Sequence, residues 1–184
     1  METTRHFVAT VYVVSDGAVA LHEHDKLGMW LPAGGHIDRD ELPHEAALRE
    51  TREELGFDVD LVAPQERITS ATVESIPQPQ HFLLEDINVD ADGPESETAR
   101  SLPQPRQFLL EDINVTPEGV GHQHVDFVYY GEVEHRDIAP AAGEQDADDW
   151  EWFAPADLRA RADELADDVV EVGIDAIEAV EGSR

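Results

Sequence analysis

The stretch GHIDRDELPHEAALRETREELGF, from Gly35 to Phe57, decides how this chain folds and where its chemistry lies. Pro43 suits the first position of a helix, and Gly56 suits the left-handed residue that ends one. The sequence therefore predicts a helix from Pro43 to Leu55, preceded by a glycine loop.

Three carboxylates share one face of this predicted helix. Glu50, Glu53 and Glu54 stand at positions i, i+3 and i+4, so their side chains point into the same space and repel one another. They also lie near the C-terminus of the helix, where the dipole is negative and favours Lys or Arg. A divalent cation would resolve both conflicts, and hard oxygen ligands favour Mg²⁺ or Mn²⁺ over Zn²⁺.

Composition alone could produce the triple, because Asp and Glu make up 42 of the 184 residues. A carboxylate triple at this spacing is expected about twice by chance in such a chain. The wider pattern is much rarer, with a chance of roughly 10⁻⁵ from the chain's own residue frequencies. Its seven fixed positions are Gly35, Glu41, Arg49, Glu50, Glu53, Glu54 and Gly56.

This pattern resembles the Nudix box, the signature of the Nudix hydrolases, which hydrolyse compounds built on a nucleoside diphosphate linked to another group. Two positions depart from the usual box. Asp40 stands where a glycine is common, and Thr51 stands where most members have an aliphatic residue. We expect Thr51 to lie beside the apolar stripe of Leu48 and Leu55, with a mild loss of burial and no loss of chemistry.

The resemblance assigns roles to the residues of the box. The implied metal ligands are Glu50, Glu53, Glu54 and the backbone carbonyl of Gly34. The implied catalytic residues are Glu50, Glu53, Arg49 and Glu41. Glu41 and Arg49 would orient the ligands, and Glu50 or an acid on a later loop would be the base. From the residues alone, Arg49 is equally well explained as the surface partner of Glu45 at i, i+4.

Substrate contacts are expected at three further places. Gly35 has no side chain, so the backbone there can approach a phosphate closely. His122, His124 and Asp126 alternate along a predicted strand and so share one face, which could bind substrate or simply be a half-buried polar face. Of the acids before the last two tryptophans, we choose Asp146 as a site residue, although most acids in such a chain are solvated charge.

Charge sets this chain apart, because 42 acidic residues against 12 basic ones give a formal charge of −30. The acids are spread along the chain, which favours adaptation to high salt over an acidic binding arm. Nonspecific binding to nucleic acid is improbable for such a charge. With no membrane span or signal peptide in the sequence, we expect a cytoplasmic protein. No cysteine is present, so disulfides and thiolate chemistry are excluded.

Residues 1–184 suit one domain. Strands and helices alternate along it, which indicates an α/β fold, and the resemblance implies the Nudix-like α/β/α sandwich with a central mixed β-sheet. The predicted strands are His6–Val14, Ala18–Glu23, Val59–Val62, His122–Val133 and Trp150–Phe153. One further helix is predicted to begin at Pro155, and another to carry the apolar stripe Leu165, Val169, Val172, Ala176 and Val180.

An internal duplication interrupts this plan. PQPQHFLLEDINV at Pro77–Val89 recurs as PQPRQFLLEDINV at Pro103–Val115, an offset of 26 residues. Two copies are too few for a solenoid. We expect the second copy to dock beside the strand that follows it, and the first to belong to a loop insertion around residues 76–102.

The sequence thus predicts a metal-dependent hydrolase that cleaves the pyrophosphate bond of a small nucleotide substrate, in the class of ADP-ribose, nucleotide sugars or (d)NTPs. The family resemblance also makes a homodimer an assembly to expect. A catalytically silent nucleotide-sensing module with the same fold is the main alternative. An isomerase on this scaffold would be expected to alter the box and to supply a catalytic Cys, which this chain lacks.

Overall fold

The computed structural model describes residues 4–24, 28–62, 73–75, 83–85, 99–101, 105–116 and 119–182. The strands of its large sheet are β1 (Thr4–Ser15), β2 (Ala18–His24), β3 (Met29–Leu31), β4 (Ala33–His36), β5 (Asp60–Leu61), β6 (Val73–Ser75), β9 (Gln107–Thr116), β10 (Gly119–Glu132) and β11 (Trp150–Phe153). The helices are α1 (Pro43–Glu54), α2 (Pro155–Ala160), α3 (Asp167–Gly182) and the short 3₁₀ helix η1 (Ala147–Asp149).

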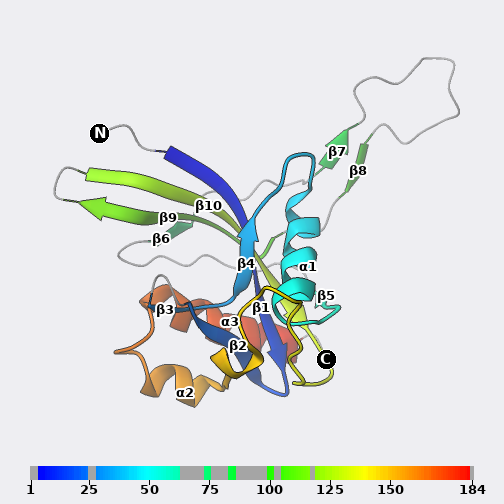
Figure 1. Cartoon of the computed structure of the whole chain (residues 1–184), viewed down its shortest axis with the longest axis vertical. Coiled ribbons are helices and arrows are strands. Elements are labelled where there is room, and N and C mark those ends of the chain that lie inside the picture. Colours follow the sequence, from blue (N-terminus) through cyan, green and yellow to red (C-terminus); the bar gives the residue numbers. More distant parts are fainter. Residues whose placement is uncertain are drawn as a thin grey trace, which may run out of the picture.

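The large sheet is mixed. Its main order is β11-β2-β1-β10-β9-β6, with β3 paired to β2, β4 to β1 and β5 to β10. The central strands β1 and β10 run parallel, whereas the other pairs are antiparallel. β1 and β10 therefore form the axis on which the other elements are placed (Figure 1).

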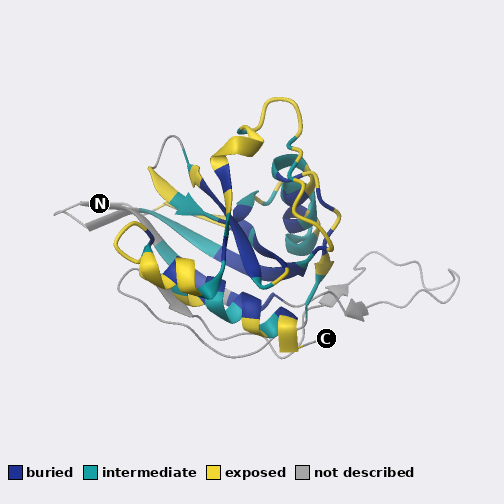
Figure 2. Ribbon diagram, turned by 90° about the horizontal axis from the view of Figure 1, so that it is seen from below, coloured by how far each residue is buried: buried dark blue, intermediate teal, exposed yellow. Residues whose placement is uncertain are grey.

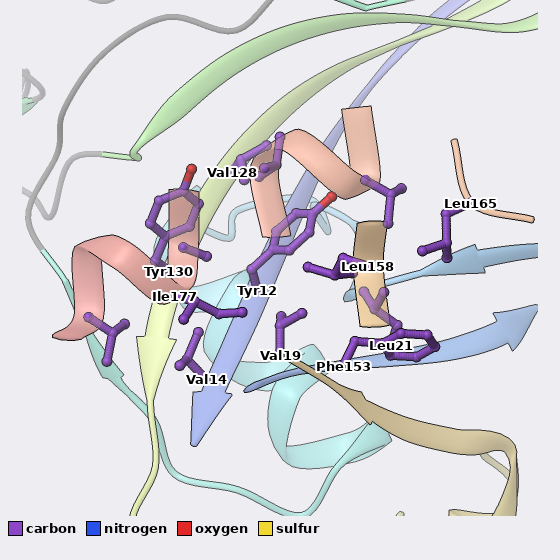
Figure 3. Close-up of a cluster of buried hydrophobic side chains, with 14 of the residues drawn as sticks. Tyr12, Val14, Val19, Leu21, Val128, Tyr130, Phe153, Leu158, Leu165 and Ile177 are labelled. Carbon is purple, nitrogen blue, oxygen red and sulfur yellow. The ribbon is translucent and has the colours of Figure 1, made fainter. Parts of the chain in front are cut away.

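Helices cover both faces of this sheet, because side chains alternate along each strand. On β1, Val11 and Val13 pack with Ala46 and Ala47 of α1 on one face. Tyr12 and Val14 belong to the cluster on the other face, which includes residues of α2 and α3. Figure 2 shows the buried residues concentrated in the sheet between the helical layers, and Figure 3 shows the second cluster at close range. The predicted α/β/α sandwich is confirmed.

Helix α1 begins at Pro43, as predicted, and ends at Glu54, one residue before the predicted end. Gly56 then adopts a φ of +77°, the left-handed conformation expected of a residue that ends a helix. A Cβ at Gly56 would also lie 2.4 Å from the carbonyl oxygen of Ala139, on the loop that follows β10. Both facts require glycine at this position.

The predicted glycine loop is in fact strand β4, which pairs antiparallel with β1. A Cβ at Gly34 would lie 2.6 Å from the carbonyl oxygen of Ala9 and 2.8 Å from Cα of Thr10. Because no side chain intervenes, the backbone packs directly against β1. The prediction of a loop was wrong, since the glycines permit close pairing and not only a turn.

Helix α3 buries the predicted stripe. Val169, Val172, Ala176 and Val180 are at most 2% exposed, and Leu165, which precedes the helix, is 6% exposed. Among the helices of the described residues, none is long and apolar enough to cross a membrane.

The second repeat copy contributes strand β9, which lies beside β10 as predicted and pairs with it antiparallel. Of the first copy, the structure describes only β7 (Leu83–Glu85), which pairs with β8 (Ala99–Ser101) in a separate two-stranded sheet. Figure 1 shows this pair away from the large sheet. The remainder of the first copy lies outside the described residues, so the loop insertion around residues 76–102 stays a prediction.

Candidate active site

Arg49, on helix α1, is the centre of the hydrogen-bond network in the box. Its Nε and Nη2 donate to the two oxygens of Glu41, each at 2.9 Å. Its Nη1 donates to Glu50 at 2.7 Å and to Glu53 at 3.1 Å, and Nη2 also donates to the backbone oxygen of His36 at 3.1 Å. One guanidinium thus joins the helix, the loop before it and strand β4.

This geometry decides between the two explanations of Arg49, as a residue that orients the box or as the surface partner of Glu45. Glu45, the alternative surface partner, instead accepts a hydrogen bond from the backbone N–H of Leu42 at 3.0 Å and so caps the helix. Arg49 is half-buried against Glu41 and Glu50, whose side chains are 16% and 15% exposed. The structure therefore places Arg49 among the carboxylates of the box.

The carboxylates differ in their surroundings. Glu54 accepts a hydrogen bond from the backbone N–H of Gly34 at 2.9 Å. Burial, together with the neighbouring charges of Glu50, Glu144 and Glu53, raises the pKa of Glu54 to about 8. Burial also raises the pKa of Glu50, against the lowering effect of Arg49. The raised pKa values follow from partial burial of the two carboxylates close to other negative charges.

Gly35 makes room for one of these carboxylates. A Cβ at Gly35 would lie 2.3 Å from Oε1 of Glu50, closer than any real contact allows. The second glycine of the pair therefore lets strand β4 approach the side chain of Glu50 directly. This is a packing role, and the substrate contact expected of Gly35 remains a proposal.

A cavity of about 260 Å³ opens beside Glu54 and Gly34. Its lining combines the end of the box with strands β2 and β3, the start of β11 and the loop before η1. The lining residues are His22, His24, Leu31, Pro32, Gly34, Glu54, Gly143, Glu144, Gln145 and Trp150. His22 stacks on Trp150 with ring centroids 4.4 Å apart and planes inclined by 14°. The cavity therefore has carboxylates in one part of its wall and flat rings in another.

Glu144 is the later acid that reaches this site. It lies on a loop whose backbone is tied to the end of α1 by the hydrogen bond from Ala141 N to Glu53 O at 2.7 Å. The side chain of Gln145 donates to the backbone oxygen of Glu23 at 3.1 Å, which ties the same loop to β2. These two contacts hold Glu144 at the cavity.

Asp146, the acid chosen from the sequence, is exposed and does not line the cavity. It is the residue that precedes η1, and its side chain makes no capping hydrogen bond there. The structure thus favours Glu144 over Asp146. Spacing could not separate the two, because the choice depends on how the loop is tied down by Ala141 and Gln145.

His122, His124 and Asp126 share one face of β10, as the alternation predicted, but it is the face opposite the box. Phe127 packs with α1, whereas Val128 belongs to the cluster with α3, so residues 122, 124 and 126 lie on the α3 side. None of the three lines the cavity. Their expected contact with substrate gains no support from this arrangement.

The donor set of the box fits a hard divalent cation. Glu50, Glu53 and Glu54 come together with Glu144 nearby, and Arg49 is the cation that bonds two of them. Gly34 lines the cavity together with Glu54. In the described part of the chain, no three His, Asp or Glu side chains already surround a common point as metal ligands would. Binding would therefore draw carboxylate oxygens away from Arg49.

Comparison with known proteins gives the family. A model of the NUDIX domain matches residues 4–112. The crystal structure of a NUDIX-family hydrolase from Clostridium perfringens is 30% identical, with a TM-score of 0.69, and the match covers 96% of this chain and 99% of that chain. The chain therefore belongs to the NUDIX family. It is a Nudix-type pyrophosphohydrolase.

Two more distant structures share the fold. The MutT protein from Methanosarcina mazei Go1 has a TM-score of 0.51 at 14% identity, over 100% of this chain and 97% of that chain. The E. coli dihydroneopterin triphosphate pyrophosphohydrolase has a TM-score of 0.50 at 16% identity, over 95% of each chain. No curated protein shows a match.

Proposed function

We propose that this enzyme uses Mg²⁺ or Mn²⁺ to cleave the pyrophosphate bond of a nucleoside diphosphate linked to another moiety. The observation that carries the proposal is that Arg49 bonds Glu50 and Glu53, while Glu54 of the same helix lines a cavity. Phosphoanhydride hydrolysis needs a positioned water and neutralised phosphate oxygens. A carboxylate-rich wall beside an open cavity is suited to both.

The residues that would hold the cation are Glu50, Glu53, Glu54 and the carbonyl of Gly34. Such a cation, when bound, would lower the pKa of a water molecule and neutralise charge on the phosphate oxygens. Glu41 would act through Arg49, since its two hydrogen bonds fix the guanidinium that contacts Glu50 and Glu53.

The base would be a carboxylate of this site. Glu50 is one candidate, because burial raises its pKa, and an oxygen of Glu50 lies beside the backbone of Gly35. Glu144, which lines the cavity from a later loop, is the alternative. Either carboxylate would accept a proton from the attacking water as it approaches phosphorus.

The substrate would place its phosphates against the carboxylate part of the wall and its remaining group toward His22 and Trp150. Flat rings in a cavity wall suit stacking on a base or packing on a sugar. ADP-ribose, nucleotide sugars and (d)NTPs are the classes proposed.

The experiment is a hydrolysis assay on a panel of these substrates in high-salt buffer with Mg²⁺, with nucleoside monophosphate as the measured product. Glu53→Gln should abolish release, because it removes a charged ligand and keeps the size of the side chain. Glu178→Gln, on the exposed side of α3, makes the same change of charge and should leave release unchanged. Unchanged activity in Glu53→Gln would contradict the assignment of Glu53 as a metal ligand.

The same panel separates an enzyme from a sensor. Calorimetry would detect a nucleotide that binds in a metal-dependent way, and the assay would show whether it is turned over. Binding with no product after hours would favour the nucleotide-sensing module.

Adaptation to high salt and a cytoplasmic location form part of the proposal. The charge of −30 is the supporting observation, because self-repulsion of this size is relieved when salt shortens the screening length. Circular dichroism after dialysis into salt-free buffer should show loss of structure, and an unchanged spectrum would count against the adaptation.

A further inference from the structure

Four histidine rings form a closed cluster on the side of the sheet opposite the box. His6 lies 5.1 Å from His36 and 4.8 Å from His122, measured between ring centroids. His124 lies 5.5 Å from His36 and 4.9 Å from His122. Each ring thus contacts two others, and we call these residues the histidine cluster.

Three strands of the sheet create the cluster. His6 of β1 is the register partner of His124 on β10, and His36 of β4 stands beside Val8, two residues further along β1. Side chains on paired strands that share a face lie close together. His6 and His36 are exposed, and His122 and His124 are half-buried, so the cluster is open to solvent.

We propose that the histidine cluster binds one divalent ion of the late first-row transition metals, represented by Zn²⁺, at a site separate from the box. Imidazole nitrogen suits Zn²⁺, Ni²⁺ and Cu²⁺, whereas the all-oxygen box suits Mg²⁺ and Mn²⁺. The two sites therefore differ in the ion they select.

The spacing of the rings matches this use. Two imidazoles bound to one tetrahedral Zn²⁺, with about 2.0–2.1 Å from nitrogen to metal, have ring centroids roughly 5 Å apart. The four measured separations of 4.8–5.5 Å lie around this value. Each neighbouring pair of rings is therefore spaced as two ligands of one ion would be.

Binding requires some rings to turn. His6 Nδ1 and His36 Nε2 are 3.0 Å apart and share a hydrogen bond, and His122 Nδ1 lies 2.8 Å from Oγ1 of Thr4. As they stand, no three of the described His, Asp or Glu side chains meet the geometry of a metal site. Rotation about χ2 is broad for histidine, so an arriving ion can redirect ring nitrogens without moving the strands.

The protonation state of the cluster supports the proposal, because only the neutral imidazole binds metal. Burial, together with the neighbouring His122, His36 and His6, lowers the pKa of His124 to about 4. His124 is therefore neutral near pH 7.

The consequence for the enzyme is local. An ion bound to His36 as well as to His6 and His124 would tie β4 to β1 and β10. β4 also contains Gly34 and Gly35, which lie against Glu54 and Glu50 of the box. The ion would therefore restrict the motion of this strand next to the box.

Calorimetry tests the proposal with Zn²⁺ alone as the probe, in high-salt buffer with excess Mg²⁺ to occupy oxygen ligands and with no substrate. The wild-type chain should bind one Zn²⁺. His6→Gln and His124→Gln should each weaken binding by about tenfold or more. His135→Gln is the matched control, since His135 is exposed and its ring contacts Phe57, away from the cluster.

Nitrogen-15 spectra of the histidine rings in the wild-type chain give a readout that does not depend on any variant folding. Zn²⁺ should shift the ring nitrogens of at least three cluster residues and leave those of His135 in place. The proposal is overturned if the cluster resonances do not move, or if both variants, folded by circular dichroism, bind Zn²⁺ like the wild type. Neither result bears on hydrolysis, which the Glu53→Gln assay tests separately.

Discussion

Arg49 and Glu41 are joined by two parallel hydrogen bonds of 2.9 Å each, between a residue of α1 and a residue of the loop before it. The pair lowers the pKa of Glu41, so the carboxylate stays ionised. The remaining nitrogen of the guanidinium contacts Glu50 and Glu53. Glu41 therefore fixes the orientation of the group that orders the box.

Replacing Arg49 with Lys should lower kcat by about 10- to 100-fold, because an ammonium cannot hold Glu41 in a two-pronged bond while reaching Glu50 and Glu53. Steady-state kinetics with saturating Mg²⁺ measures the change. Arg52→Lys is the control, since Arg52 pairs with Asp58 at the exposed surface of the same helix. Equal effects of the two substitutions would contradict the role of Arg49.

Glu144 and Asp146 can be compared directly, because both are exposed acids on one short segment. Glu144→Gln should lower the rate of hydrolysis by about tenfold or more. Glu144 lines the cavity, and its charge helps to raise the pKa values of Glu50 and Glu54. Asp146→Asn should leave the rate unchanged. A larger effect of Asp146→Asn would show that Asp146, the acid chosen from the sequence, is the site residue.

Thr51 is fully buried between α1 and the sheet, where its hydroxyl donates to the carbonyl of Ala47 at 2.7 Å. Thr51→Val should stabilise the protein by about 0.5–1 kcal/mol, because it buries a methyl group in place of a hydroxyl while Ala47 keeps its helical partner. Urea unfolding measures the gain. Hydrolysis should not change, and a loss of stability would show that the hydroxyl is needed.

Asp126 makes stability depend on pH. Burial raises its pKa well above the usual value and raises the pKa of neighbouring Glu111 to about 7. As pH rises from about 4 to 7, the unfolded chain loses these protons while the folded chain keeps them, so stability should fall across this window.

Asp126→Asn should therefore flatten the fall in melting temperature between pH 4 and pH 7 and should stabilise the protein at pH 7. Asp137→Asn makes the same substitution at a side chain that is 99% exposed, and its profile should follow the wild type. Parallel profiles for Asp126→Asn and the wild type, measured at constant high salt, would contradict this explanation.

The sequence correctly predicted those helices and strands whose ends are determined by the residues at the ends themselves. Pro43 and Gly56 bound helix α1 because each favours a backbone conformation that begins or ends a helix. Alternation correctly placed His122, His124 and Asp126 on one face of their strand. It could not say which face of the sheet this was, because that depends on where α1 and α3 pack.

The features that the local sequence did not predict depend on contacts between segments that are far apart in the chain. Arg49 bonds Glu41 and not Glu45 because the loop before α1 folds back along the helix. The glycines became strand β4 because β1 offered an edge for pairing. The sequence pattern does not point to His6 and His36 as site residues, because only the register of β1 with β4 and β10 brings them to His122 and His124. A search for histidines at alternate positions in neighbouring predicted strands could have suggested them.

Metal binding at the box can be measured by Mn²⁺ titration followed by electron paramagnetic resonance. Free Mn²⁺ should disappear as wild-type protein is added in high-salt buffer, and Mg²⁺ should compete. Glu54→Gln should weaken Mn²⁺ binding by about tenfold or more and abolish hydrolysis in the same samples, whereas Glu178→Gln should change neither. Mn²⁺ binding that is equally tight in Glu54→Gln would contradict metal binding at the box. Hydrolysis that continues without any divalent ion would contradict its dependence on metal.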